Sequence, residues 1–280
     1  MDLSLVICTR NRGPYLLQTL RSLAELRDAA DWELVVVNNG STDDTGEIIE
    51  RFRPRFGRPL AVVDEPRPGL GRARNSGWRR TRGRVVAFTD DDCYPAHDYL
   101  RKILECFEGN DIGFVGGMVL LHDPTDYPIT IQTLDRPVDL QPGEYVPAGL
   151  IQGANFAFLR SALEAVGGFD DRMGAGTPFA CEDVDILARL LGRGIKGAYS
   201  PRPLVYHHHR RKTDEEASRL SRAYDYGRGA YFAKCLLDPA LRKVYAKQFY
   251  WQFRGQGFSR NARVVAGAAH FLLSSLFAPR

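Results

Sequence analysis

Three consecutive carboxylates, Asp90, Asp91 and Asp92, directly follow an apolar run at residues 85–89. The run is rich in β-branched and aromatic residues and predicts a buried strand. Ligands of open α/β sheets bind at the carboxyl ends of strands, where three adjacent carboxylates repel one another unless a cation neutralises them. A hard divalent ion would do so and would bring a phosphate group with it. From these residues alone, a solvated acidic turn is the alternative.

Two further polar groups could take part in the same chemistry. Glu182 and Asp183 open a predicted helix at residues 182–191, where carboxylates either serve a ligand or only stabilise the helix start. His207 begins a run of three histidines and three cations at residues 207–212. Imidazole can complete the coordination of a metal held by carboxylates, and cations can neutralise a leaving phosphate. A surface turn is the alternative for this run.

The predicted elements bring these groups to one edge of a sheet. The first half alternates strand and helix patterns, which predicts parallel βαβ units in an α/β fold. Strands are expected at residues 3–8, 33–37, 60–63, 85–89, 151–159 and 199–206. Ser41 or Thr42 is expected to cap the helix after the second strand. Residues 122–149 carry several prolines and predict a long surface excursion beside the site.

Composition narrows the class of protein. The chain has 280 residues, 44% of them hydrophobic, which is enough for one large core or two modest ones. Its net charge of +4 favours anionic ligands or an acidic membrane surface over nucleic acid. Five cysteines without CxxC spacing predict reduced thiols, and the amino terminus lacks the pattern of a secretory signal. These features predict a cytoplasmic protein that binds no nucleic acid, with the inner face of the cell membrane as a further expected location.

The motifs, taken in order, resemble those of the family 2 glycosyltransferases. The similarity spans about residues 4–211 and is carried by segments 6–12, 37–43, 70–77, 90–92, 153–155, 167–170 and 182–185 and by His207. The resemblance implies a GT-A fold, with a Rossmann-like, mostly parallel central sheet flanked by helices. It also implies one domain at residues 1–212, with a nucleotide-binding half at 1–121 and an acceptor-binding half at 122–212, followed by a helical C-terminal extension at 213–280.

The resemblance implies specific roles on the donor side. Asp92 would ligate Mn²⁺ or Mg²⁺ directly, His207 would be the second protein ligand, and Asp90 and Asp91 would face the ribose or the water shell of the metal. A metal so placed would stabilise the departing nucleoside diphosphate. Further nucleotide contacts would come from Thr9, Arg10, Arg12, Asn39, Asp43 and Arg74, and from a flexible loop that contains Arg210, Arg211 and Lys212.

On the acceptor side the resemblance implies that Asp183 is the general base, which takes the proton of the attacking hydroxyl. Glu182 would orient the acceptor, with Gly153 and Asn155 on the same side. Most members with this arrangement invert the anomeric centre. Asn38 departs from the family, since an Asp is usual there; a UDP-sugar is the favoured donor, with thymine and guanine left open.

The C-terminal segment departs more broadly from the family. Its last apolar run, residues 264–277, is flanked by arginines and is shorter than the roughly 20 residues that span a bilayer. A helix lying on a membrane and a helix packed on the domain or in a homodimer both fit this pattern. The acceptor would accordingly be a saccharide or a lipid-linked saccharide.

The motifs favour one class of function over three others. The leading hypothesis is a metal-dependent glycosyltransferase of polysaccharide, glycolipid or glycoconjugate biosynthesis. A nucleotidyltransferase is the first alternative, but residues 9–13 are not a glycine-rich triphosphate loop. An inactive sugar-nucleotide-binding module is the second, although Asp92, Asp183 and His207 are all present. A glycoside hydrolase is disfavoured because it works with two carboxylates, whereas three consecutive carboxylates occur here, as a metal site requires.

Overall fold

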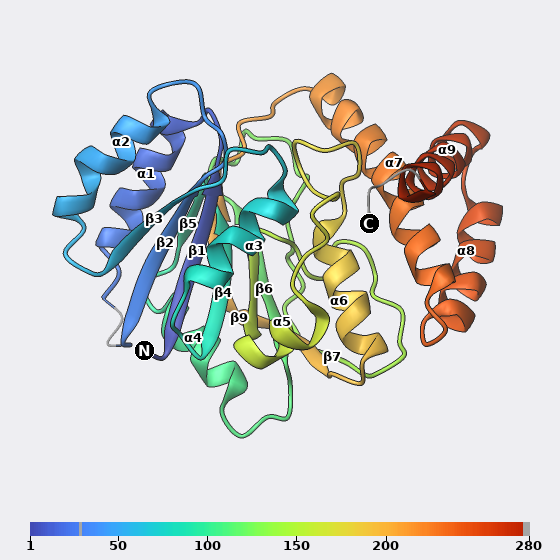
Figure 1. The fold of residues 1–280 in the computed structure, drawn as a ribbon, viewed down its shortest axis with the longest axis horizontal. Coiled ribbons are helices and arrows are strands. Elements are labelled where there is room, and N and C mark those ends of the chain that lie inside the picture. Colours follow the sequence, from blue (N-terminus) through green and yellow to red (C-terminus); the bar gives the residue numbers. More distant parts are fainter. Residues whose placement is uncertain (28–29, 277–280) are drawn as a thin grey trace.

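The computed structural model describes residues 1–27 and 30–276. Its strands form a sheet in the order β3-β2-β1-β4-β8-β6-β9-β5, with β7 paired to β9 (Figure 1). The predicted α/β class and mostly parallel sheet are confirmed. The strands are β1 (Leu3–Thr9), β2 (Trp32–Asn38), β3 (Leu60–Asp64), β4 (Val85–Asp90), β5 (Cys93–Pro95), β6 (Phe114–Leu121), β7 (Val138–Leu140), β8 (Asn155–Leu159) and β9 (Gly197–His207).

Helices cover both faces of the sheet because its central strands are apolar on both sides. Leu5 and Ile7 of β1 pack with residues of α1, α2 and α4, whereas Val6 packs with residues of α3, α5 and α6. The helices of the first part are α1 (Gly13–Ala24), α2 (Thr45–Phe52), α3 (Leu70–Arg80), α4 (Tyr99–Phe107), α5 (Arg160–Val166) and α6 (Glu182–Gly192), with a 3₁₀ turn, η1, at Arg53–Arg55.

Two local expectations are wrong. The predicted strand at 151–159 begins only at Asn155, and it runs antiparallel between β4 and β6. The residue before α2 is Asp44, not Ser41 or Thr42. Ser41 instead accepts a hydrogen bond from the backbone N–H of Asn11, at 3.0 Å. The polar residues after β2 are therefore used to tie the loops that follow β1 and β2 together.

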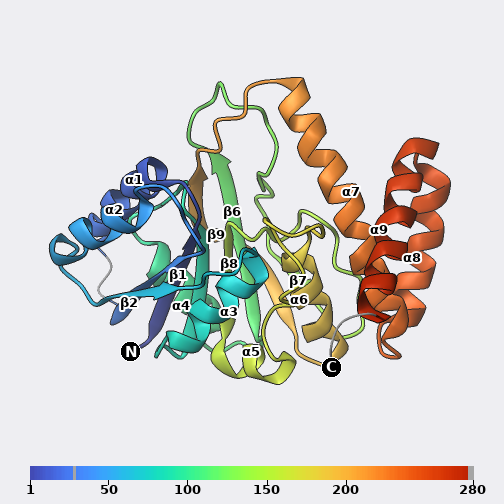
Figure 2. The ribbon, with the colours of Figure 1, turned by 45° about the horizontal axis from the view of Figure 1, so that its top comes forward.

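The C-terminal extension forms a lobe beside α6 (Figure 2). It contains α7 (Asp214–Leu237), α8 (Arg242–Gly255) and α9 (Phe258–Leu276), and α7 packs closely on α9. Gly229 and Gly267 permit this approach, since a Cβ on either would overlap the backbone of the other helix. In the part of the chain described, no helix is long and apolar enough to cross a membrane. Phe277 and Arg280 of the predicted apolar segment lie outside the described residues.

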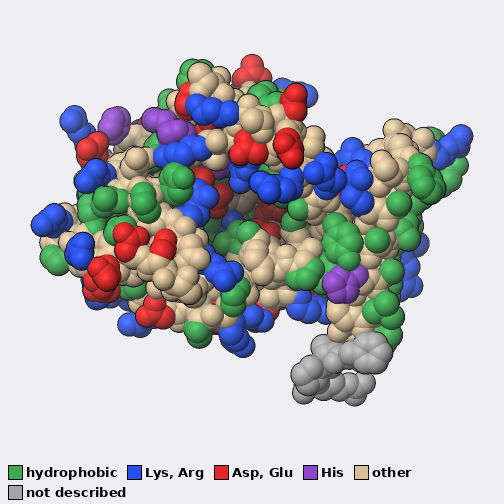
Figure 3. Space-filling model, turned by 90° about the horizontal axis from the view of Figure 1, so that it is seen from above, with side chains coloured by type: hydrophobic (Ala, Val, Ile, Leu, Met, Phe, Trp, Pro, Cys, Tyr) green, Lys and Arg blue, Asp and Glu red, His purple; other side chains and the backbone are tan. Residues whose placement is uncertain are grey.

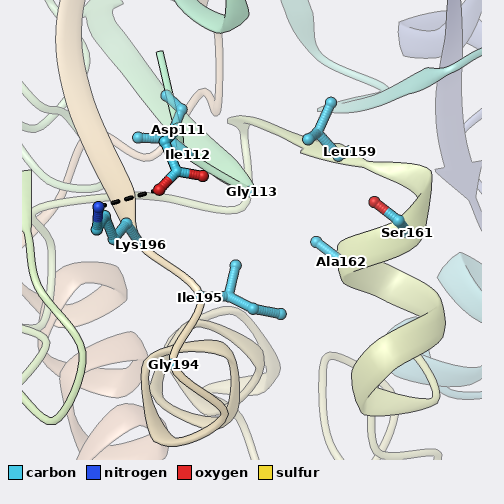
Figure 4. A pocket seen from close by; sticks show the side chains of 9 residues that line it. All are labelled: Asp111, Ile112, Gly113, Leu159, Ser161, Ala162, Gly194, Ile195 and Lys196. Carbon is cyan, nitrogen blue, oxygen red and sulfur yellow. Dashed lines mark hydrogen bonds and ion pairs between the residues drawn. The ribbon is translucent and has the colours of Figure 1, made fainter.

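A hollow of about 240 Å³ lies at the amino ends of β6 and β9 (Figure 4). It is lined by Gly113, Ile195 and Lys196 among others, and Lys196 forms an ion pair with Asp111 at 3.0 Å. The polar residues predicted to carry chemistry lie at the opposite, carboxyl ends of the strands. Since α/β sheets bind ligands at carboxyl ends, this hollow is not the candidate site.

Candidate functional site

The candidate site lies where β1, β4 and β9 end. Asp90 is the last residue of β4, and β5 begins at Cys93, so Asp91 and Asp92 form the short link between two strands. β5 pairs antiparallel with β9 in a register that sets Cys93 opposite His207. This pairing brings the histidine beside the carboxylates although more than a hundred residues separate them. Figure 3 shows a hollow on this face with acidic side chains inside it and Lys and Arg along its rim.

Asp92 and His207 form the best candidate metal pair. The Asp92 Oδ1 and His207 Nε2 atoms are 3.3 Å apart, and both side chains are buried. Burial disfavours a charged imidazole, but the hydrogen bond and charge of Asp92 outweigh it and raise the pKa of His207. Burial likewise opposes ionisation of Asp92, but His207 and Arg12 hold the pKa of that carboxyl below its ordinary value. Asp92 therefore lies between the Arg12 guanidinium and the His207 imidazole.

The donor set fits Mn²⁺ or Mg²⁺. Ligand atoms of Asp90, Asp92, Cys93 and His207 lie within 4.8 Å of one another. Burial raises the pKa of the Cys93 thiol well above its ordinary value, which keeps it protonated and a poor ligand. Two carboxylates and an imidazole remain, and oxygen donors with a nitrogen suit a hard or borderline divalent ion.

Asp91, expected from the resemblance to face the ribose or the water shell of the metal, makes its contacts within the protein in this structure. It is 6% exposed and accepts a hydrogen bond from Thr9 Oγ1 at 2.6 Å. The Arg12 guanidinium lies 2.8 Å from its other oxygen and also contacts Asp92. Thr9 and Arg12, predicted as nucleotide contacts, thus hold the carboxylate link in place in this structure.

Asn39 is also used within the protein. Its side-chain amide donates to the carbonyls of Glu65 and Arg67 and accepts from the N–H of Gly69. Both amide N–H groups of Asn39, predicted as a nucleotide contact, are thus used within the protein, where Asn39 shapes the loop at residues 65–69. Of the other predicted nucleotide contacts near it, Asp43 accepts from the N–H of Thr45.

Arg74 joins the donor and acceptor sides. Its guanidinium is buried, 2.6 Å from Glu182, 3.6 Å from Asp90 and 3.1 Å from the carbonyl of Gly153. It also packs on the rings of Phe156 and Phe169. The role of Arg74 as a nucleotide contact stays a prediction, and in this structure its guanidinium contacts residues of the protein. Its charge holds carboxylates from both halves together.

The residues predicted on the acceptor side are half-buried or buried. Asp183 is half-buried, and its carboxylate accepts from the N–H groups of Gly153 at 3.2 Å and Val184 at 2.8 Å. Glu182 is buried against Arg74, and burial raises its pKa against the opposing charge of Arg74. Gly153 has no room for a side chain, since a Cβ would overlap Arg74.

Two of the predicted acceptor contacts, Asn155 and Glu182, are buried and hydrogen-bonded within the protein. Asn155 is 1% exposed, accepts from Tyr99 and donates to the carbonyls of Met118 and Pro203. Its hydrogen bonds therefore tie β8 to its neighbours and leave no free donor for an acceptor. Glu182 likewise accepts from Arg74 through Oε1, which ties the start of α6 to α3.

The segment after β9 is held against α1. Arg210 donates to Gln18 Oε1 at 2.7 Å, and its guanidinium lies 4.2 Å from the centre of the Tyr15 ring. Arg211 is half-buried, and Arg10 is exposed at the end of β1. The structure thus brings Arg210 to the donor side of the site.

Sequence reasoning missed three supporting residues. The carbonyl of Thr130 lies 3.2 Å from Nδ1 of His207 and orients the imidazole. Tyr15 and Gln18 hold Arg210, as described above. Each comes from a segment remote in sequence from its partner, and no local pattern marks it.

Solved structures of similar shape identify the fold. The mannosyltransferase PcManGT from Pyrobaculum calidifontis, in complex with GDP-Man and Mn²⁺, matches 100% of this chain and 76% of its own, with a TM-score of 0.68 and 19% identity. TarS 1-349 of S. aureus in complex with UDP-GlcNAc matches 97% of this chain and 80% of its own, with a TM-score of 0.67 and 16% identity. At such identities the likeness shows the fold alone, which is GT-A.

The sequence then identifies the family. The model of Glycosyl transferase family 2 matches residues 4–167, and the chain belongs to this family. YdaM of Bacillus subtilis (strain 168), described as a probable glycosyltransferase, is 28% identical over 217 residues, covering 72% of this chain and 50% of YdaM. The pre-mycofactocin glycosyltransferase of Mycobacterium tuberculosis (strain ATCC 25618 / H37Rv) is 28% identical over 222 residues, which cover 75% of this chain and 43% of that protein. The match spans half or less of the length of both relatives.

Proposed function

We propose that this protein transfers a sugar from a nucleoside diphosphate sugar to an acceptor hydroxyl. The proposal rests on Arg74, which contacts one carboxylate on each side of the site. Its one guanidinium contacts Asp90 of the candidate metal cluster and Glu182, the neighbour of the candidate base. A donor-binding group and an acceptor-binding group are therefore adjacent at the carboxyl edge of the sheet, as a transfer between two substrates requires.

Asp92 and His207 would hold Mn²⁺ or Mg²⁺. When bound, such an ion supplies Lewis-acid stabilisation of the charge on the departing nucleoside diphosphate. The described residues suit this role because one oxygen of Asp92 contacts Arg12 and the other faces the His207 imidazole, the second proposed ligand. Arg210 and Arg211 would neutralise the diphosphate as part of the segment after β9.

Asp183 would act as the general base of an inverting reaction. The acceptor oxygen attacks the anomeric carbon, the bond from that carbon to the diphosphate oxygen breaks, and the hydroxyl proton passes to Asp183. Its two backbone hydrogen bonds fix the carboxylate and leave lone pairs for the incoming proton. A single base on the acceptor side suits inversion in one displacement.

We propose UDP as the nucleotide of the donor. Known structures of the fold bind both GDP-Man and UDP-GlcNAc, so the fold does not decide the base. Asn38 donates to Asp64 at 3.2 Å at the carboxyl end of β2, where its amide could rearrange to meet uracil. The acceptor would be a saccharide or lipid-linked saccharide of a polysaccharide, glycolipid or glycoconjugate pathway.

A thermal-shift panel tests the proposal most directly. UDP-, GDP- and dTDP-sugars would each be added with and without Mn²⁺, and the stabilising donor would then be assayed for release of its nucleoside diphosphate. We expect metal-dependent stabilisation by a UDP-sugar and slow release even to water. Stabilisation without any release, with saccharide acceptors present, would instead indicate a sugar-nucleotide-binding module. No stabilisation by any donor would overturn the proposal.

A further inference from the structure

Outside the candidate active site, a second group of metal-ligating side chains lies beyond the ends of β6 and β9. Asp123 and Asp126 follow β6, and His208 follows β9. One ligand atom from each of the three lies within 4.8 Å of the others. The two chain segments are already joined there, because the N–H of His122 donates to the carbonyl of His207 at 3.0 Å.

Asp126 supplies an independent indication of a ligand. Its carboxylate is 97% buried, since the residue is 3% exposed, and its Oδ1 atom has no hydrogen-bond partner among the described residues. A buried carboxylate oxygen without a partner is costly unless a cation lies close to it. The nearest cation is the Lys212 ammonium, at 4.0 Å from this oxygen and 3.0 Å from Asp123 Oδ2. The Lys212 side chain is half exposed, and its position shows that Asp123 and Asp126 together attract positive charge.

We propose that Asp123, Asp126 and His208 form a second divalent-cation site, which the Lys212 ammonium leaves when the ion binds. Two carboxylates and one imidazole suit a borderline divalent ion such as Zn²⁺ or Co²⁺. Each ligand has a partner that fixes it in place. Thr125 donates to Asp123, the N–H of Arg210 donates to Asp126 Oδ2, and Tyr94 lies 3.4 Å from Nδ1 of His208.

The site would fix the segment that carries Arg210 and Arg211. Asp126 already holds the backbone of Arg210 at 2.9 Å, and the N–H of Tyr127 donates to the carbonyl of Arg211 at 2.7 Å. An ion shared between the 122–126 segment and His208 would strengthen this connection. This consequence rests on the proposed function of the two arginines, whereas binding of the ion does not.

Metal stoichiometry tests the proposal in the full-length protein without an affinity tag. After removal of metal by a chelator, Zn²⁺ retention would be measured by equilibrium dialysis, and Co²⁺ would report its ligand geometry by absorption. The Asp92→Ala background disables the first site. We expect this variant to retain one ion, and retention to weaken at least about tenfold on adding His208→Ala or Asp123→Asn. His97→Ala, at an exposed histidine, and Asp111→Asn, at a distant exposed carboxylate, should have no effect.

Lys212→Gln gives the sharpest arm of the test. Because the ammonium competes for Asp123 and Asp126, removing it should raise Zn²⁺ affinity in the Asp92→Ala background by up to roughly fivefold, as expected for an exposed ion pair. Thermal unfolding would confirm that each variant is folded. The proposal is overturned if the Asp92→Ala protein retains no ion, if His208→Ala and Asp123→Asn leave retention unchanged, or if Lys212→Gln does not increase it. If the wild-type protein binds one ion, and that ion is retained in Asp92→Ala but lost in His208→Ala, the result would contradict the first site and support the second.

Discussion

The donor and acceptor sides of the site hold their carboxylates in different ways. On the predicted donor side, Asp92 lies between two side chains, the Arg12 guanidinium and the His207 imidazole. On the acceptor side, Asp183 is held by two neutral backbone N–H groups. The Arg12 side chain can move away when an ion binds between Asp92 and His207, whereas backbone amides keep a carboxylate in place without neutralising its charge. The first arrangement suits a metal ligand and the second suits a base.

The largest expected effect comes from removing the donor-side carboxylate. Asp92→Ala should abolish transfer and the Mn²⁺ dependence of nucleotide binding, because the remaining ligands cannot hold a hard ion and a diphosphate together. Thermal shifts with a UDP-sugar, with and without Mn²⁺, would measure the binding, and nucleotide release would measure the transfer. Asp111→Ala, at an exposed carboxylate far from the site, is the matched control.

The histidine assignment can be tested in the same assays. His207→Ala should weaken metal binding less than Asp92→Ala, since imidazole is one ligand among several. His209 is buried and lies 3.0 Å from the carbonyl of Tyr127, away from Asp92. Normal metal dependence in His207→Ala together with its loss in His209→Ala would show that the wrong histidine is assigned. Unchanged turnover in Asp92→Ala would refute the metal site itself.

The second largest effect should appear on the acceptor side alone. Asp183→Asn keeps the shape of the side chain but cannot accept the proton, so the rate should fall by roughly 10²–10⁴-fold. Donor and metal binding should remain, because the acceptor side lies across Arg74 from the candidate metal ligands. Single-turnover rates and donor affinity would be measured together. A parallel fall in donor affinity would place Asp183 in the nucleotide site instead.

Removing the arginine on each side should lower the free energy of unfolding by different amounts, because Glu182 and Asp92 differ in the partners that remain. Arg74→Met leaves Glu182 buried without a cation and should cost about 3–5 kcal/mol of unfolding free energy. Arg12→Met should cost less, because Arg12 is about one-third exposed and Asp92 keeps His207. Denaturant unfolding would measure both. Adding Glu182→Gln to Arg74→Met should recover part of the loss; a double variant no more stable than Arg74→Met would contradict the buried pair as its cause.

The comparison also shows what the sequence could and could not predict. Continuous apolar runs, period-3.6 patterns and polar residues at strand ends were enough for the α/β class, and the family resemblance was needed to pair Asp92 with His207. Strand patterns carry no direction, so the antiparallel β8 could not be foreseen. The burial of Arg74 depends on Glu182, 108 residues away, and that of Asn155 on Tyr99, 56 residues away. A motif names such residues, but only the packing decides whether they face a ligand or the interior.

The smallest expected effect concerns how the acceptor reaches its side of the site. Exposed apolar residues gather on the C-terminal lobe, among them Phe258, Leu273 and Leu276 of α9, with arginines nearby (Figure 3). A helix with such a face binds anionic lipid reversibly, and salt weakens the arginine contribution. If this lobe presents a lipid-linked acceptor, the chain should co-sediment with anionic vesicles at low salt and less at high salt.

Leu273→Glu with Leu276→Glu should remove this sedimentation and lower transfer to a vesicle-borne acceptor, while donor binding stays unchanged. Leu237→Glu, at an exposed leucine that ends α7, is the matched control. A wild-type protein that does not sediment at low salt would rule out the membrane interpretation. A change in its sedimentation-equilibrium mass on introducing the two glutamates would then identify the α9 face as a dimer contact, and the acceptor would need no membrane.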